Sequence, residues 1–127
     1  WPGSNGNGSL IWHRRGLTLD FEHDQLTSFR VIMLTGDDFP ADPGTQPFRG
    51  RLLRNGIPVD LPGGAGADAI IAAMGAPESR DDDEDELILR YQQGQIVTEW
   101  EIDHPQGLYA INVFAEGQVD ESIARGF

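Results

Sequence analysis

Two stretches of this chain carry the same alternating pattern, and this repetition constrains the fold more than any other feature. The first is GLTLDFEHDQLTSFRVIML (16–34) and the second is GQIVTEWEIDHPQGLYAINVF (94–114). In each, apolar and polar residues alternate, a polar tip interrupts them, and the alternation resumes, which is typical of a β-hairpin with one buried face. The sequence therefore predicts an antiparallel sheet with two similar parts.

Each hairpin is preceded by another short alternating segment that ends at a glycine, SLIWHRRG (9–16) in the first part and ELILRYQQG (86–94) in the second. Each part is therefore predicted to be a three-stranded meander. The predicted strands are 9–15, 17–22 and 27–35 in the first part and 86–93, 95–102 and 107–115 in the second.

The second part has an additional front end. The segment 50–61 predicts a hairpin with Asn55-Gly56 at its tip, since this pair tolerates the positive φ angles of a type I′ turn. The segment 67–75 predicts a short helix that Gly75 ends. Its apolar face consists of Ile70, Ile71 and Met74. A helix of this kind covers one face of an antiparallel sheet.

The predicted fold class is α+β, with an antiparallel sheet of about eight strands and one main helix, from a partial and a complete repeat. Residues 1–46 are the partial first repeat, a three-stranded meander and linker. Residues 47–127 are the complete second repeat, with hairpin, helix, three-stranded meander and C-terminal tail. The pattern predicts that the missing strand pair and helix of the first repeat lie upstream of residue 1. The alternative interpretation is that repeated hairpins are an ordinary feature of antiparallel sheets.

Charge and composition exclude several classes of function. The 127 residues include 21 acidic and 9 basic side chains, so the formal net charge is −12. Such a chain is repelled by phosphate backbones and anionic lipid, which argues against nucleic-acid and membrane-surface roles and favours a basic protein partner. No apolar run is long enough to predict membrane insertion. The absence of cysteine excludes disulfides and thiolate metal sites.

The strongest local signal is DDDEDE (81–86), six consecutive carboxylates that repel one another and must stay solvated. Three interpretations remain open: a plain linker, a docking strip for a basic partner, or a calcium site. The calcium site is the least favoured, because the ligand spacing and the glycine of an EF-hand loop are missing.

The histidines provide the only hint of acid–base chemistry. His23 adjoins Asp24 and His104 adjoins Asp103, but both pairs fall at predicted hairpin tips, where polar residues are expected in any case. His13 lies on a predicted strand, and no helical metal-ligand spacing is present. No serine occupies a G-x-S-x-G elbow. We therefore predict no catalytic residue, no metal and no cofactor.

Aromatic residues on the predicted strands belong mostly to the core, but strand parity places Tyr91 and Trp100 on the outward face as candidate partner anchors. Glu99 and Glu101 flank Trp100 and extend the acidic surface. Five arginines are expected to pair with neighbouring carboxylates across strands: Arg14, Arg15, Arg30, Arg51 and Arg54. The predicted partner-binding residues are Asp81, Asp82, Asp83, Glu84, Asp85, Glu86, Tyr91, Glu99, Trp100 and Glu101.

A resemblance to a known group rests on MGAP (74–77), a polar linker and LRYQQGQIVTEWEID (89–103). This arrangement resembles the repeat of the β-lactamase inhibitor protein and SmpA-like families, chiefly through Gly75, Pro77 and the Tyr91/Gly94 hairpin. The resemblance implies a helix against an antiparallel sheet, tandem modules as in bacterial toxin-immunity proteins, and a protein-binding role without catalysis.

The function predicted from the sequence is that of a non-enzymatic protein-binding module, a bacterial immunity or inhibitor protein that occludes a basic toxin or enzyme. The main alternative is a periplasmic or envelope-associated structural domain of a larger protein, and a third is an enzyme that uses His23 or His104. The bacterial cytoplasm is favoured over the periplasm. The uncovered strands of the partial repeat predict a homodimer or association with an upstream fragment.

Overall fold

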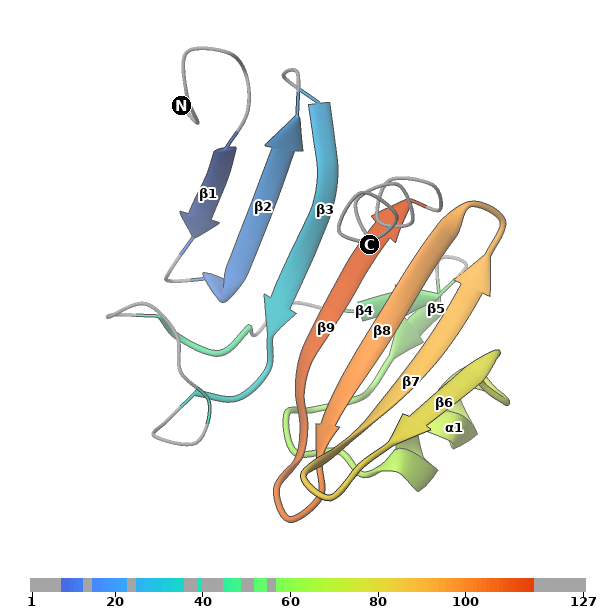
Figure 1. Ribbon diagram of the computed structural model, residues 1–127. Coiled ribbons are helices and arrows are strands. Elements are labelled where there is room, and N and C mark those ends of the chain that lie inside the picture. Colours follow the sequence, from blue (N-terminus) through green and yellow to red (C-terminus); the bar gives the residue numbers. More distant parts are fainter. Residues whose placement is uncertain are drawn as a thin grey trace.

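The computed structural model describes residues 8–12, 15–22, 25–35, 39, 45–48, 52–54 and 57–115. The strands are β1 Gly8–Trp12, β2 Leu17–Glu22, β3 Gln25–Ile32, β4 Leu52–Arg54, β5 Ile57–Val59, β6 Ser79–Asp82, β7 Glu86–Gln93, β8 Ile96–Asp103 and β9 Gly107–Ala115, and helix α1 is Ala67–Met74. Seven strands form one antiparallel sheet in the order β1-β2-β3-β9-β8-β7-β6, and β4 and β5 form a separate pair (Figure 1).

The two predicted meanders are confirmed as β1–β3 and β7–β9, and the third strands of the two meanders pair with each other. In this pairing Phe29 lies opposite Val113 and Val31 lies opposite Ile111. Both meanders therefore share one sheet, whose outer strands in the described part of the chain are β1 and β6.

A single sheet of about eight strands was expected, but the structure has a seven-stranded sheet and the separate pair β4–β5. The hairpin predicted over residues 50–61 is present, since Arg54 of β4 lies opposite Ile57 of β5, although Asn55 and Gly56 themselves lie outside the described residues. It does not extend the sheet. Instead β4 and β5 lie behind it, and Val59 packs against the core (Figure 1). In this position Val59 adds to the apolar surface that the core buries.

The linker interpretation required the acidic run to be a loop throughout, but its first two residues belong to a strand. Residues 79–82 form β6, which pairs with β7 so that Arg80 lies opposite Leu89 and Asp82 lies opposite Leu87. An outer strand needs only one hydrogen-bonded neighbour, and its side chains stay in water, so consecutive carboxylates are tolerated there.

Side chains alternate along each strand, so one face of the sheet carries the main core and the other carries a polar row, next to which Val97 and Phe114 are buried. Leu89, Trp100, Ile111 and Val31 are neighbours in register on β7, β8, β9 and β3, and all four are buried. The adjoining row on the opposite face consists of Arg90, Glu99, Asn112 and Arg30. The core therefore lies behind the sheet as Figure 1 shows it, and the polar row lies in front.

Helix α1 covers part of the apolar face, as predicted. Ile70 is fully buried in the core, and Ile71 and Met74 pack against it. Gly75 ends the helix at φ 86°, and its N–H donates to the Ile71 carbonyl at 2.7 Å. Within the described residues, no helix has the length and apolar character needed to cross a membrane.

The loop before α1 is attached to the start of β9 by main-chain hydrogen bonds. The Gly64 N–H donates to the Leu108 carbonyl at 2.9 Å, and the Leu108 N–H donates to the Ala65 carbonyl at 2.8 Å. Leu108 is itself fully buried, so these bonds are shielded from water. They fix the position of the helix relative to the sheet.

Candidate functional site

The acidic strip (residues 81–85) lies along the outer strand β6 and the turn that follows it, and all five of its side chains are exposed. Asp81 and Asp82 lie on β6, and residues 83–85 form the turn into β7. Asp83 shapes this turn, because its Oδ1 accepts the N–H groups of Asp85 at 2.8 Å and Glu86 at 2.9 Å. These two bonds lower the pKa of Asp83, so the turn is held best when this carboxyl is ionised.

His104 in the β8–β9 turn binds the strip directly. Its Nε2 lies 2.8 Å from the Asp83 main-chain carbonyl and 2.9 Å from Asp82 Oδ1. The adjacent Asp103 does not contact the ring; its Oδ2 accepts the N–H of Gln106 at 3.0 Å and closes the turn. Asp103 and His104 therefore lie in a turn, as the sequence favoured, and His104 joins this turn to the acidic strip. His13, His23 and Asp24 lie outside the described residues.

The stabilising effect of His104 is expected to depend on pH. The Asp83 carbonyl, with the Asp82 carboxylate, raises the pKa of His104 above its ordinary 6.5. Its contribution to stability is therefore fully present below pH 6.5 and is lost as the pH rises through the folded-state pKa. Chemical denaturation of wild type and His104→Ala should differ at about pH 5.5 and converge by about pH 8. A difference that persists unchanged at the higher pH contradicts this.

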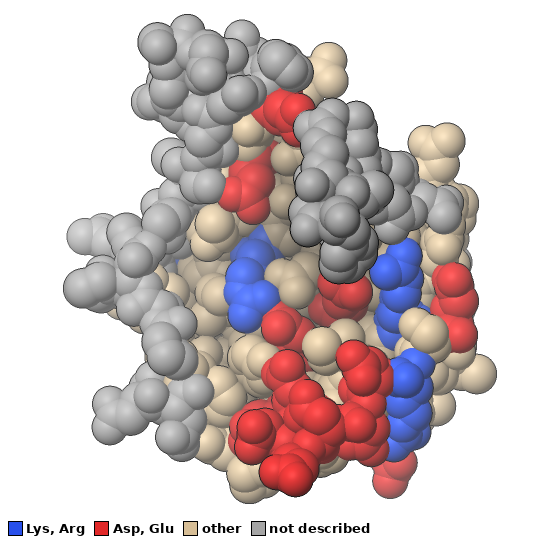
Figure 2. Space-filling view, viewed as in Figure 1, with Lys and Arg blue, Asp and Glu red and all other residues tan. Residues whose placement is uncertain are grey.

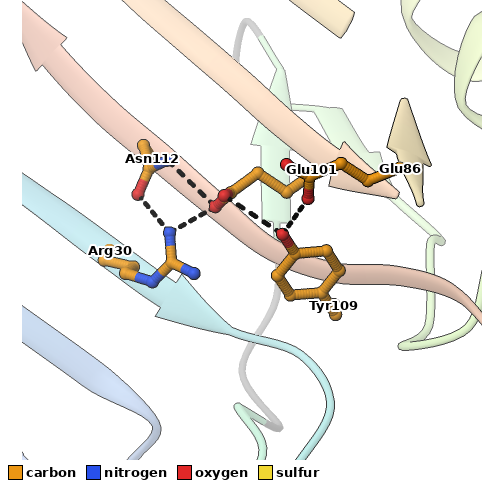
Figure 3. A network of polar contacts seen from close by, with 5 residues as sticks. All are labelled: Arg30, Glu86, Glu101, Tyr109 and Asn112. Carbon is orange, nitrogen blue, oxygen red and sulfur yellow. Dashed lines mark hydrogen bonds and ion pairs between the residues drawn. The ribbon is translucent and has the colours of Figure 1, made fainter. Parts of the chain in front are cut away.

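A network of polar contacts joins β3, β9, β8 and β7 on the same side of the sheet (Figure 3). Arg30 Nη1 donates to Glu101 and, at 2.8 Å, to Asn112 Oδ1. Glu101 also accepts from Asn112 Nδ2 at 3.0 Å. This confirms the expected pairing of Arg30 with a carboxylate, which comes from two strands away, across β9.

Tyr109 links this network to the start of β7. Its hydroxyl donates to Glu86 Oε2 and lies 3.3 Å from Glu101 Oε1 (Figure 3). Burial, together with the hydrogen bond to Glu86, raises the pKa of Tyr109, so the phenol stays protonated and serves as a donor between two carboxylates. The Tyr109 ring is also packed, since Phe39 stacks on it with ring centroids 5.0 Å apart.

A hollow of about 290 Å³ opens beside Tyr109, next to the acidic strip. It is lined by Arg30, Ile32, Leu34, Phe39, Asp85, Glu86, Asp103 and Tyr109. Figure 2 shows acidic side chains gathered at the lower end of this face, where the β6–β7 and β8–β9 turns lie. The strip and the hollow therefore form one continuous acidic surface.

The structure does not bring all ten predicted partner-binding residues together. Asp81, Asp82, Asp83, Glu84 and Asp85 are exposed at the edge, and Glu86 and Glu101 belong to the Tyr109 network. Glu99 shares the polar face, with its Oε2 3.7 Å from Arg90 Nη1. Glu86, Glu99 and Glu101 therefore lie on the polar face, whereas residues 81–85 lie at the edge of the sheet and in the turn that follows.

Tyr91 and Trp100 were expected on the outward face, and this was wrong. Both lie on the face that carries α1, with Trp100 only 4% exposed. The Tyr91 hydroxyl donates to the Gly75 carbonyl at 2.8 Å, so it fastens the end of the helix. Trp100 is in register with Leu89 and Ile111 on the neighbouring strands β7 and β9, so it shares their buried face.

The apolar face contains a feature that the sequence did not reveal. A groove of about 1050 Å³ runs along it, and both of the exposed large hydrophobic side chains in the described part of the chain, Leu26 at 50% and Ile96 at 49%, lie on its lining. Met74 and Phe48 form further parts of its wall. The groove adjoins the core that Trp100 helps to fill.

The described residues contain no group of three or more His, Asp or Glu side chains arranged to hold a metal ion. Within the acidic strip, Asp82 contacts His104 and Asp83 accepts two main-chain N–H groups, so these carboxylates are engaged by protein donors. What this surface offers is negative charge and a hollow, and both suit recognition of a cationic group.

Comparisons with known proteins support the fold alone. No protein-family model matches the chain, and no curated protein matches it. The crystal structure of a DUF4309 family protein (YjgB) from Bacillus subtilis is similar, with a TM-score of 0.51 and 16% sequence identity over 91% of this chain and 68% of that chain. The resemblance to β-lactamase inhibitor protein and SmpA-like modules stays a prediction.

Proposed function

We propose that this chain is a non-enzymatic protein-binding module of the bacterial immunity or inhibitor type, which neutralises a basic toxin or enzyme by occluding it. The observation that carries the proposal is the acidic strip: five consecutive acidic side chains, all exposed, on an outer strand and its turn. Asp83 and His104 hold the conformation of this turn, so the surface is ordered before a partner arrives.

The strip acts mainly on the rate of association. Like charges concentrated at one end of a molecule with a formal net charge of −12 attract a basic partner over a distance of about one Debye length, roughly 8 Å at physiological salt. Contact along the sheet edge then excludes the partner's own substrate by steric overlap. Because surface charges are screened, binding weakens as salt rises.

The two-repeat organisation belongs to the same proposal. The meanders β1–β3 and β7–β9 have the same strand order and meet through their third strands, which is the arrangement expected of duplicated units related by a pseudo-twofold axis. Residues 1–46 and 47–127 are the proposed partial and complete copies. The second copy alone contributes the strip and the Tyr109–Glu86 contact.

Capture of partners from bacterial lysate, followed by mass measurement of intact complexes at low and high salt, tests the proposal. We expect one basic protein of fixed stoichiometry, released as salt rises, whose activity the chain inhibits when both are purified. A homodimer with no such partner, or a captured protein whose activity is unaffected by saturating amounts of the chain, would contradict the immunity or inhibitor role.

A further inference from the structure

Among the described residues that line the hollow beside Tyr109, acidic groups outnumber basic ones. Asp85, Glu86 and Asp103 contribute carboxylates, whereas the one guanidinium of this described lining, that of Arg30, already pairs with Glu101. Asp103 uses Oδ2 to close its turn, and Tyr109 donates to Glu86 through Oε2 only. Each of the three carboxylates therefore has a further oxygen lone pair to offer a donor, and their negative charge favours a donor that is cationic.

The remaining walls indicate which cation fits. Ile32 and Leu34 supply aliphatic surface, and the stacked pair of Phe39 and Tyr109 supplies aromatic surface. A compact hydrated ion gains little from such walls. A cation on an aliphatic stem gains from all of them, since the stem packs on apolar side chains while the charged end reaches the carboxylates.

Between the two basic side chains, the hollow favours arginine. A guanidinium is planar, it stacks on aromatic rings, and its fork of N–H groups pairs with carboxylates in a bidentate manner. An ammonium group is a more strongly hydrated point charge, and it makes no planar contact with a ring. The volume of about 290 Å³ is near the lower end of ligand pockets, which suits one side chain rather than a larger ligand.

We propose that this hollow binds the guanidinium of an arginine side chain that the basic partner presents. The inference rests on the proposed function, and it adds a specific anchor to the general attraction of the acidic strip. The strip brings the partner to this end of the sheet, and the hollow fixes its orientation by taking one arginine between the carboxylates and the Tyr109 ring.

Direct titration with a small probe tests this without the partner. N-acetyl-arginine amide is added to isotopically labelled protein at low salt, and amide resonances are followed by NMR. We expect saturable shifts concentrated at Asp85, Glu86, Asp103 and Tyr109, weaker binding of the lysine counterpart, and no saturable shifts with the citrulline counterpart, which has the same shape without the charge. Equal shifts from the arginine and lysine probes spread along residues 81–84, or no shifts, would overturn the proposal.

A matched pair of variants locates the site. Asp103→Asn keeps an oxygen that can accept the Gln106 N–H and removes one charge, and Asp68→Asn removes one exposed charge from α1 on the other face of the sheet. We expect binding of the arginine probe to weaken about threefold in Asp103→Asn and to stay unchanged in Asp68→Asn. Equal weakening in both variants would mean that only net charge matters and would overturn the proposal.

The two proposals can fail separately. If the arginine probe does not bind the hollow while a basic partner is captured and inhibited, the arginine anchor is wrong and the protein-binding role stands. If the probe binds as expected while no basic partner is found, the immunity or inhibitor role is wrong, and the hollow remains a site selective for guanidinium.

Discussion

Replacing Gly107 by alanine is expected to lower the free energy of unfolding by about 3–5 kcal/mol, through the combined effects of a steric clash and backbone strain. A Cβ at this position would lie 2.1 Å from the main-chain oxygen of Gly64, and the residue has φ +90°. Gly64 cannot retreat freely, because its N–H donates to the Leu108 carbonyl at 2.9 Å. The substitution therefore separates the loop before α1 from the sheet.

Gly94→Ala is the matched control for this experiment. Gly94 has φ +62° in the β7–β8 turn, but a Cβ there would meet no atom within 4 Å. Only the left-handed backbone is then unfavourable, which costs about 1–2 kcal/mol. Urea denaturation of both variants measures the difference in the free energy of unfolding. A Gly107→Ala chain that does not fold at all would be the extreme form of the expected loss. Equal losses in the two variants would show that the close approach to Gly64 is not maintained.

Trp100→Ala is expected to lower the free energy of unfolding by about 3–5 kcal/mol, because a large buried side chain leaves a cavity. Trp100 is 4% exposed, its Nε1 donates to Thr98 Oγ1 at 2.9 Å, and its ring meets Tyr91 edge to face at 6.4 Å. The loss also includes the hydrogen bond, since Thr98 Oγ1 loses its donor. Thermal or urea unfolding followed by circular dichroism measures the change.

Ile96→Ala controls for position on the same strand. Ile96 lies on the same face of β8 as Trp100 but is 49% exposed, so its truncation is expected to lower the free energy of unfolding by less than about 1 kcal/mol. If Trp100→Ala lowers the free energy of unfolding as little as Ile96→Ala does, Trp100 does not lie in the core. It would then again be a candidate for binding a partner.

Local patterns predicted most of the secondary structure. The six strands of the two meanders and helix α1 are near their predicted ranges, because alternation and glycine placement act over a few residues. The pairing of β3 with β9 could not be predicted, since it joins segments about eighty residues apart. The burial of Trp100 was missed for another reason: its neighbours in register, Leu89 and Ile111, face the core that α1 covers, and alternation alone does not say which face of a strand is covered.

An irregularity in strand pairing explains why Tyr109 was not identified as part of the site. The register shifts between Glu101 and Ile102, which lie opposite Ala110 and Leu108 respectively, so that Tyr109 is an extra residue on β9. Strict alternation would place Tyr109 on the apolar face with Ile111. The bulge instead directs its side chain to Glu86 and Glu101 on the polar face.

The exposure of the acidic strip could be predicted, and its surroundings could not. Mutual repulsion alone requires that consecutive carboxylates stay in water, whatever the fold. The hollow, in contrast, needs Arg30 from β3, Phe39 from the segment that follows and Tyr109 from β9. These residues are far apart in the sequence and carry no shared motif, so only the assembled sheet reveals them as a site.

The most direct test of protein binding through the acidic strip compares association rates of a captured basic partner with two variants across a range of salt. Asp81→Asn/Glu84→Gln removes two charges from the strip, and Asp60→Asn/Asp68→Asn removes two exposed charges elsewhere. We predict that the strip variant associates about threefold to tenfold more slowly at low salt and depends less on salt, while the control behaves as wild type. If both variants change alike, or neither changes, the acidic strip is not the binding surface.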